Sequence, residues 1–317
     1  MPCPCQRTDT LMKSLSSPHI LITGATGLLG RPVLRACAEN VAWRATGTSF
    51  RRTGPGLERV DLSQTERISA FLDRLAPTVI IHSAAERRPD VSEKDPAGTL
   101  RLNVGATAAL AQWAAAHRAF LIYISSDYVF DGTRPPYQPT SQTHPVNAYG
   151  QSKLDGEYAV QAACRSYAIL RVPILYGEVE NLGESPVTVL AKNMLNARPG
   201  ERLAMEHWAT RYPTHTRDVA AVLRQMVAHR LTHPDFSGIF HWSGNEPMTK
   251  YDMACAFAPL LSFDPTRLLA DATPPAGAPR PKDCHLDSAA LETLGIGQRT
   301  SFLSAVPSIL ATHLCRT

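Results

Sequence analysis

Short runs rich in aliphatic and β-branched residues alternate with longer helical segments through the first 172 residues. The strand-like runs cover residues 19–23, 43–49, 78–82, 120–124 and 168–172, and helical composition fills residues 28–40, 65–75, 93–117 and 148–165. Parallel strands need long crossover connections, and this alternation places helices on both faces of the sheet. The sequence therefore predicts an α/β fold built on a doubly wound parallel sheet of the Rossmann type.

The alternation weakens beyond residue 171, where Pro and Gly become frequent. Helical patterns return near residues 216–230 and 249–261. We expect a disordered arm at residues 1–17, a Rossmann domain at 18–171, and a smaller, partly discontinuous C-terminal α/β domain. That second region would comprise residues 172–214 and 231–317, with the helix at 215–230 packed on the first domain.

Composition narrows the class of protein. With 317 residues and 44% apolar content the chain can bury a core, and its Lys and Arg residues exceed Asp and Glu by only four (32 against 28). No long basic run is present, which argues against nucleic-acid or membrane-surface binding. Seven scattered cysteines without a CxxC pair indicate neither a metal site nor a disulfide framework. Since no apolar run reaches about 18 residues, we expect a cytoplasmic protein, with a nuclear location also open.

A glycine-rich turn, Gly24-Ala25-Thr26-Gly27-Leu28-Leu29-Gly30, follows the first predicted strand and opens a helix. Glycines at this place let a pyrophosphate approach the backbone, and the helix N-terminus attracts its charge. The spacing is GxxGxxG rather than GxGxxG, so a simple strand–helix turn is the alternative. The placement favours a dinucleotide site at Gly24, Thr26, Gly27, Leu28, Leu29 and Gly30.

The end of the second strand indicates which dinucleotide binds. Where an NAD-selective site carries an acid roughly twenty residues after the turn, this chain has Phe50-Arg51-Arg52. Guanidinium groups bind phosphate in bidentate fashion, which favours NADP, although a solvated loop with incidental arginines is the alternative. Asp61 and Leu62 follow a third strand, which lies before the run at 78–82, and would border the adenine.

Two further strand ends supply candidates at the same edge of the sheet. Ser83 and Arg87 follow the strand at 78–82, where small neighbours allow a close cofactor approach and Arg87 would meet a phosphate. Ser126 ends the strand that begins at residue 120. Asn103, within the helical stretch 93–117, is expected to tie strand ends together and to have no catalytic role.

Tyr149 and Lys153 lie four residues apart and therefore share one helix face. A nearby ammonium favours the ionised form of a phenol, so the pair predicts a general acid or base that works near neutral pH. The alternative is a common surface pair without function. Ser126 would bring a hydroxyl beside Tyr149.

The glycine turn with Ser126, Tyr149 and Lys153 resembles the extended short-chain dehydrogenase/reductase superfamily. Residues 123–132, with Tyr212-Pro213-Thr214-His215, resemble its dTDP-4-dehydrorhamnose reductase branch. That resemblance implies an NADPH-dependent reductase of a nucleotide-linked 4-keto sugar. Tyr149 would donate the proton, Lys153 would hold the nicotinamide ribose and lower the Tyr149 pKa, and Ser126 would polarise the carbonyl.

Four longer segments resemble the beta, regulatory subunit of methionine adenosyltransferase II. They are residues 84–91, 173–180, 241–246 and 291–300, and the resemblance runs from about Ile20 to Thr300. It implies a non-catalytic subunit that binds NADP and associates with the catalytic subunit of methionine adenosyltransferase as a hetero-oligomer. The NADP pocket implied by this family comprises residues 26–29, 50–52 and 61–62 with Ser83, Arg87, Tyr149 and Leu175.

The C-terminal tail departs from this family, which ends in a basic, aromatic segment that reaches into the partner. Here residues 301–317 form a shorter and mostly aliphatic tail, so docking of the partner through this tail is an open question. The first expectation is thus a regulatory subunit that tunes methionine affinity and the response to product in S-adenosylmethionine synthesis. The alternative is the reductase, and a third idea is that NADP(H) occupancy changes partner affinity through linkage.

Overall fold

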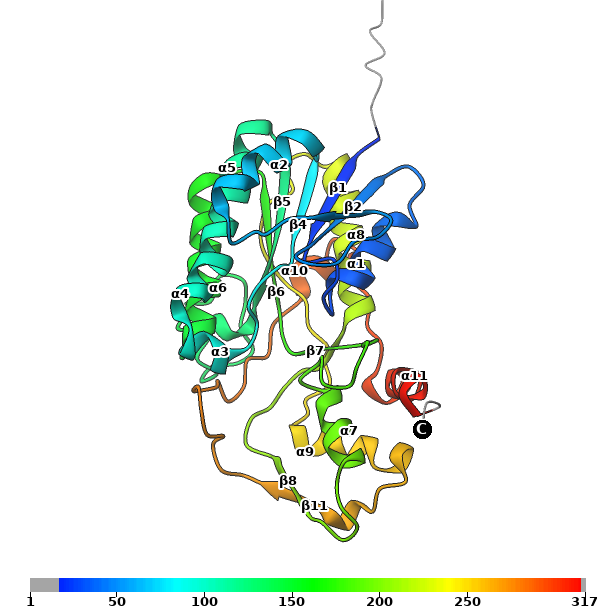
Figure 1. The fold of residues 1–317 in the computed structure, drawn as a ribbon. Helices are drawn as coiled ribbons and strands as arrows, with labels where there is room; N and C mark the ends of the chain where they lie inside the picture. Colours follow the sequence, from blue (N-terminus) through cyan, green and yellow to red (C-terminus); the bar gives the residue numbers. More distant parts are fainter. Residues whose placement is uncertain (1–16, 315–317) are drawn as a thin grey trace, which may run out of the picture.

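The structure, a computed structural model, describes residues 17–314. The arm expected at residues 1–17 lies, apart from Ser17, outside the described residues. Seven strands form one parallel sheet in the order β10-β6-β5-β4-β1-β2-β3, which confirms the predicted doubly wound α/β fold (Figure 1). The strands are β1 (His19–Thr23), β2 (Arg44–Ser49), β3 (Leu57–Arg59), β4 (Val79–His82), β5 (Phe120–Ser126), β6 (Tyr167–Val172) and β10 (Gly238–His241).

Helices cover both faces of this sheet (Figure 1). On one face α1 and α8 enclose a core that includes Ile20 and Ile22, while Leu21 points into the core beneath α2, α5 and α6. Alternate residues of β1 are therefore buried on opposite sides, as a strand covered on both faces requires. The helices are α1 (Gly30–Ala38), α2 (Ile68–Leu75), α3 (Pro89–Lys94), α4 (Pro96–Leu100), α5 (Ala106–His117), α6 (Ala148–Ala163), α8 (Thr216–Thr232) and α10 (Ala289–Glu292).

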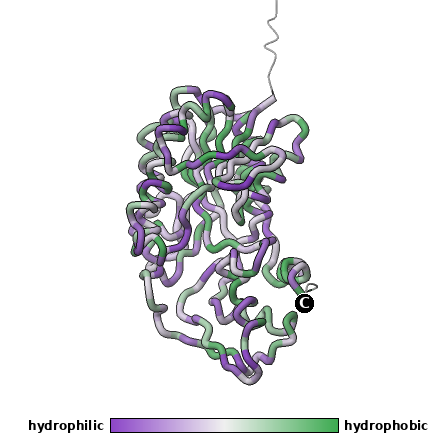
Figure 2. The backbone as a smooth tube through the Cα atoms, viewed as in Figure 1, coloured by the Kyte–Doolittle hydropathy of each residue, from purple (hydrophilic) through white to green (hydrophobic). Residues whose placement is uncertain are grey.

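A second region lies beyond the carboxyl edge of the sheet (Figure 1). Its core joins α7 (Thr188–Leu195), α9 (Lys250–Phe257) and α11 (Phe302–Leu314). Two small parallel sheets complete it, β8 (Leu203–Glu206) with β11 (Leu268–Asp271), and β7 (Leu175–Tyr176) with β9 (Thr214–His215). Figure 2 shows α11 as a largely hydrophobic helix, and five of its side chains are buried in this core.

Two details differ from the sequence expectation. The helical stretch at 93–117 is interrupted, because Pro96 begins a new helix that Asp95 caps by accepting a hydrogen bond from Gly98 N at 2.9 Å. A π-helical turn, Arg101–Gly105, then leads into α5. In addition, β10 pairs with β6 in the large sheet although the sequence assigns residues 231–317 to the second region.

Helix α6 begins at a side-chain cap and packs tightly on β5. Asn147 accepts a hydrogen bond from Gly150 N at 2.8 Å. A Cβ at Gly150 would lie 2.2 Å from the Tyr128 carbonyl oxygen, and one at Gly156 would lie 2.2 Å from the Tyr123 hydroxyl. Only glycine therefore lets α6 approach the carboxyl edge so closely, and this approach positions Tyr149 and Lys153.

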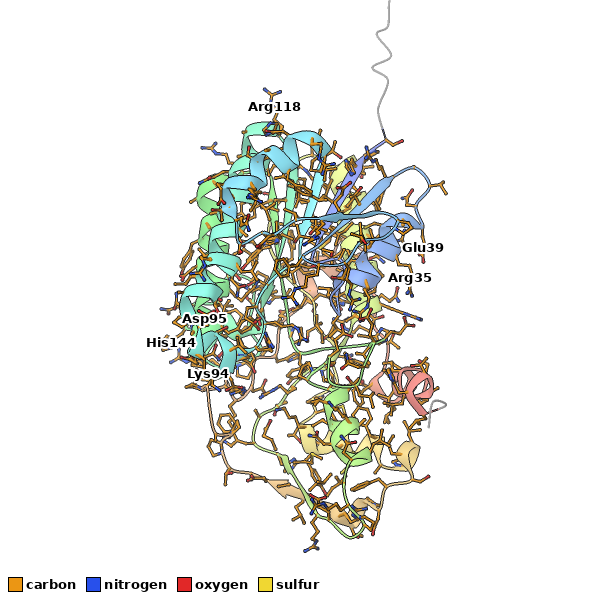
Figure 3. The ribbon with its side chains drawn as sticks, viewed as in Figure 1. Arg35, Glu39, Lys94, Asp95, Arg118 and His144 are labelled. Atoms are coloured by element: carbon orange, nitrogen blue, oxygen red, sulfur yellow. The ribbon has the colours of Figure 1, made fainter. Side chains whose placement is uncertain are left out.

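The molecular surface carries ordinary charged side chains. Arg118, Glu39 and Lys94 project outward from helix ends (Figure 3). Across residues 17–314, none of the helices combines the length and the apolar character that crossing a membrane demands.

Candidate functional site

The three glycines of the turn after β1 have different tasks. Gly24 has φ +66°, and a Cβ there would lie 2.9 Å from Ala84 backbone atoms; a Cβ at Gly30 would lie 2.1 Å from the Gly24 carbonyl oxygen. Both positions therefore exclude a side chain for packing reasons. Gly27 is exposed, and its Cβ would meet nothing closer than 3.4 Å. Gly27 is thus the glycine of the turn whose backbone stays open to solvent.

The remaining turn residues divide between core and surface. Leu28 and Leu29 are 7% and 8% exposed, so their side chains belong to the core and only their backbone faces the turn. Thr26 is half-buried, and its carbonyl accepts a hydrogen bond from Arg31 Nη1 at 2.8 Å. The turn is therefore held rigidly at the N-terminus of α1.

Residues 178–184, which we call the acidic loop, lie against the arginines of this site. Arg52 donates to both carboxylate oxygens of Glu180, at 2.5 and 2.6 Å. Arg87 Nη2 donates to the Glu184 carbonyl oxygen at 2.5 Å. Two arginines predicted to meet cofactor phosphates thus converge with this loop, which links β7 to α7.

A cavity of about 470 Å³ opens beside these residues. Thr26 borders it from the turn, Arg31 from α1, and Arg52 from the segment after β2. Phe50 is 56% exposed, and the Arg51 guanidinium lies 5.2 Å from the centre of its ring. The guanidinium groups of Arg31, Arg35 and Arg52 border this cavity, and such groups suit a phosphate.

Other predicted cofactor residues make structural contacts within the chain. Asp61 accepts hydrogen bonds from Ser63 N and Oγ at 2.9 and 2.7 Å, and Leu62 is buried in the core beneath α2. The Ser83 hydroxyl donates to the Thr23 carbonyl at 2.6 Å. Leu175 begins β7 and is half-buried, packed against the core under α1 and α8.

Ser126, Tyr149 and Lys153 lie together where β5 meets the start of α6. The Ser126 hydroxyl donates to Asp127 Oδ1 at 3.0 Å and accepts from Tyr128 N at 3.2 Å. Tyr149 is half-buried, and Lys153, only 4% exposed, places Nζ 4.1 Å from the centre of the Tyr123 ring. The hydroxyl, phenol and ammonium predicted from sequence are thus brought to one edge of the sheet.

The electrostatics of this group differ from the sequence expectation. Burial raises the pKa of Tyr149, although hydrogen bonding with Ser126 acts in the opposite direction, and Asp127 raises it further. Burial lowers the pKa of Lys153 to about 7, against the opposing effect of Glu157. Burial therefore keeps the phenol protonated near neutral pH, and the group that opposes burial most is Ser126 rather than the predicted ammonium.

Sequence reasoning missed the charges that surround this group. Glu157, one turn beyond Lys153 on α6, accepts from Arg171 Nε at 2.9 Å and Nη2 at 2.6 Å, and from the Ser125 hydroxyl at 2.5 Å. Asp127 is buried, and burial raises the pKa of its carboxyl to about 7. The (i, i+4) spacing of Lys153 and Glu157 was the one available signal; the Arg171 contact crosses from β6 to α6.

Asn103 has a structural role, but it ties one strand end to a helix rather than tying strand ends together as predicted. Its amide oxygen accepts from Glu86 N at 2.8 Å, while its nitrogen donates to the Glu86 carbonyl at 2.9 Å and to the Ser152 hydroxyl at 3.0 Å. These bonds tie the segment after β4 to α6. They hold the two halves of the site at a fixed separation.

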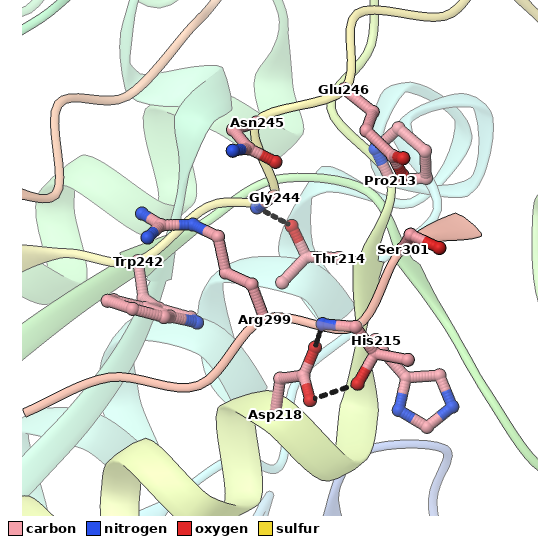
Figure 4. A pocket seen from close by; sticks show the side chains of 11 residues that line it. Pro213, Thr214, His215, Asp218, Trp242, Gly244, Asn245, Glu246, Arg299 and Ser301 are labelled. Carbon is pink, nitrogen blue, oxygen red and sulfur yellow. Dashed lines mark hydrogen bonds between the residues drawn. The ribbon is translucent and has the colours of Figure 1, made fainter. Parts of the chain in front are cut away.

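A second cavity, of about 190 Å³, lies where the C-terminal segment crosses α8 (Figure 4). Asp218 accepts from Thr300 N at 2.7 Å and Thr300 Oγ1 at 2.8 Å, and Arg299 lies 4.3 Å from the centre of the Trp242 ring. Glu246 accepts from Phe302 N at 2.6 Å. Because these polar groups already bind the chain itself, we interpret this cavity as the anchor of the C-terminal segment.

Comparison with known proteins agrees with this geometry. The RmlD substrate binding domain family matches residues 18–315. A dTDP-4-dehydrorhamnose reductase from Clostridium acetobutylicum has a TM-score of 0.81 and 25% identity, covering 94% of this chain and 100% of that one. The dTDP-4-dehydrorhamnose reductase of Bacillus anthracis, solved in complex with NADP, has a TM-score of 0.77 and 24% identity. The match covers 93% of this chain and 98% of that one. The fold and site thus define a reductase-like Rossmann protein.

A closer similarity in sequence narrows this class. Methionine adenosyltransferase 2 subunit beta of Rattus norvegicus is 49% identical over 304 residues, which cover 95% of this chain and 90% of that protein. The chain therefore belongs to the RmlD substrate binding domain family and, within it, to the methionine adenosyltransferase 2 beta subunits.

Proposed function

We propose that this chain is a non-catalytic regulatory subunit of a methionine adenosyltransferase. It binds NADP and modulates the affinity of the catalytic subunit for methionine and its response to product in S-adenosylmethionine synthesis, a part of one-carbon metabolism in the cytoplasm. The observation that carries the proposal is 49% identity across 95% of the chain to a protein named as the beta subunit of that enzyme.

Several features support NADP as the cofactor. The turn exposes Gly27 at the N-terminus of α1, which suits a pyrophosphate. Arg51 and Arg52 stand where an NAD-selective site would carry an acid, and a structural neighbour was solved with NADP. The proposed contacts are Gly24, Thr26, Gly27, Leu28, Leu29, Gly30, Phe50, Arg51, Arg52, Asp61, Leu62, Ser83, Arg87, Tyr149, Lys153 and Leu175.

The C-terminal helix bears on how the partner docks. Phe302, Val306 and Ile309 of α11 are buried in the core of the second region, and His313 Nε2 lies 3.1 Å from the Val179 carbonyl oxygen. Because α11 contributes to the fold of its own chain, we propose that the catalytic subunit docks mainly on other surfaces. Residues 315–317 lie outside the described part of the chain.

The test is capture of the catalytic subunit by the purified chain, followed by methionine kinetics of the complex. We expect capture and a shift in the methionine KM, both with the full chain and with a chain that ends at Leu314, which keeps α11 intact. A chain that neither captures the catalytic subunit nor alters its kinetics would refute the proposal.

A reductase of a nucleotide-linked 4-keto sugar is the second candidate. Ser126, Tyr149 and Lys153 are all present, and the structural neighbours include dTDP-4-dehydrorhamnose reductases. In that reaction a protonated Tyr149 would donate to the forming alkoxide. NADPH oxidation with a panel of keto-sugar nucleotides tests it; no turnover beside proven NADPH binding would reject it.

A further inference from the structure

The acidic loop places three carboxylates and no basic residue within seven positions, from Glu178 to Glu184. Each carboxylate meets arginine side chains of the Rossmann part. Glu178 pairs with Arg35 and Arg217, and Glu180 and Glu184 pair with residues at the proposed cofactor opening. The loop therefore supplies a row of counter-ions to arginines that border that opening.

Glu184 anchors the loop. Its carboxylate, 15% exposed, accepts from Arg31 Nη1 at 2.7 Å and Nη2 at 2.9 Å, and Arg31 also donates to the Thr26 carbonyl of the glycine turn. The same carboxylate accepts from Glu180 N at 2.9 Å. Charge-assisted bonds at a partly buried position hold this end of the loop at α1.

Glu180 is held differently. Its side chain is 45% exposed and its bonds to Arg52, itself 54% exposed, form the bidentate pair described above. The Arg52 guanidinium lowers the pKa of the Glu180 carboxyl, which stays ionised at neutral pH. An exposed ion pair of this kind exchanges readily, because water and other ions compete for both partners.

We propose that Glu180 is an internal counter-ion that occupies the place of the cofactor 2′-phosphate at Arg52 and thereby lowers the preference for NADP over NAD. The inference rests on the proposed NADP site. Binding of NADP requires Arg52 to exchange the Glu180 carboxylate for the 2′-phosphate, while Glu184 keeps the loop anchored to Arg31. NAD, which has a 2′-hydroxyl, binds with the Arg52–Glu180 pair intact.

The Glu180 carboxylate and the 2′-phosphate compete for the one guanidinium of Arg52. Both groups offer paired oxygens to the fork of Arg52, but a phosphate carries more charge and more acceptor oxygens than a carboxylate. Exchange therefore favours NADP, reduced by the cost of releasing Glu180. Removing that carboxylate charge removes the cost for NADP alone.

The experiment measures the dissociation constants of NADP and NAD for the full chain and for Glu180→Gln at one ionic strength. We expect Glu180→Gln to bind NADP roughly two- to five-fold more tightly, the size of an exposed ion pair, and NAD as before. Glu178→Gln is the matched control, because it removes the same charge from the same loop at a similarly exposed side chain. It should leave both constants unchanged.

Three outcomes would overturn the counter-ion role. Equal NADP binding by Glu180→Gln and the unchanged chain would show that the carboxylate does not compete. If Glu178→Gln tightened NADP binding by the same factor, the effect would come from the total negative charge of the loop and not from Glu180. Absence of dinucleotide binding by the unchanged chain and by both variants would refute the NADP site itself, and the counter-ion role with it.

Discussion

The two ends of the proposed cofactor cleft hold their charges in opposite ways. At the phosphate end, Arg52 and Glu180 are 54% and 45% exposed. At the end that holds Tyr149 and Lys153, Arg171 and Glu157 are 3% and 2% exposed and share their bonds with Ser125 and the neighbouring strands. The first pair can exchange a partner with a ligand at little cost, whereas the second is fixed by loss of solvation.

The exposed pair is suited to binding a ligand, and the buried pair is suited to positioning its neighbours. Under the two proposals, exposed charges at the opening would select an anion, while the buried network beneath Lys153 would set the local electrostatics without touching a ligand. The site therefore has one adaptable end and one rigid end. Variants at each end should differ in the property that they change.

The largest effect is expected from breaking the buried pair. Arg171→Met leaves the Glu157 carboxylate buried without its counter-ion, and should lower the free energy of unfolding by about 3–5 kcal/mol. Urea unfolding at pH 7 measures this. Arg74→Met, which breaks the exposed pair with Glu58, is the control and should cost about 1 kcal/mol or less. Similar losses of stability in both variants would contradict the contrast between the buried and the exposed ion pairs.

The glycine turn contains one tightly packed glycine, Gly30, and one exposed glycine, Gly27. Gly30→Ala forces a methyl group against the Gly24 carbonyl and should cost about 1–3 kcal/mol of stability. Gly27→Ala should change stability by about 0.5 kcal/mol or less, yet weaken NADP binding, because its methyl group points to the exposed side. Thermal unfolding and cofactor titration distinguish them. A Gly27→Ala protein with normal NADP affinity would argue against that turn as the phosphate site.

Lys153 predicts a pH dependence of stability. Its pKa is lowered from 10.5 to about 7 on folding, so between these values the unfolded chain binds more protons, and stability gains up to about 1.4 kcal/mol per pH unit as pH rises. Lys153→Met should remove this contribution, so that its stability rises less steeply than that of the unchanged chain between pH 7 and 9. If the stability of both proteins rose equally with pH, the Lys153 ammonium would be solvated in the folded chain as it is in the unfolded one.

The smallest effect is expected at Tyr149. Under the regulatory proposal the phenol positions cofactor and transfers no proton, so Tyr149→Phe should leave the methionine kinetics of the complex unchanged. Those kinetics should be measured with and without NADP. Loss of regulation while NADP still binds would contradict this prediction and would assign the phenol a direct role.

The fold and half of the site could be predicted because their signals are local. Strand and helix periods, the glycines after β1 and the Tyr149–Lys153 spacing each lie within a few residues of sequence. The interruption by Pro96 is equally local, but the helical composition on either side of it hides the boundary. Strand β10 gave no comparable signal, since its place beside β6 depends on the packing of the whole sheet.

By itself the sequence determined the doubly wound sheet, the glycine turn after β1, the arginines after β2 and the family to which the chain belongs. Only the tertiary structure decided which charges meet. Glu180 is 128 residues from Arg52, and Glu184 is 153 residues from Arg31. The direction of the Tyr149 pKa was likewise decided by burial. A charge has no preferred partner along the chain, and its pKa depends on the solvent that folding removes, so neither property is written in local spacing.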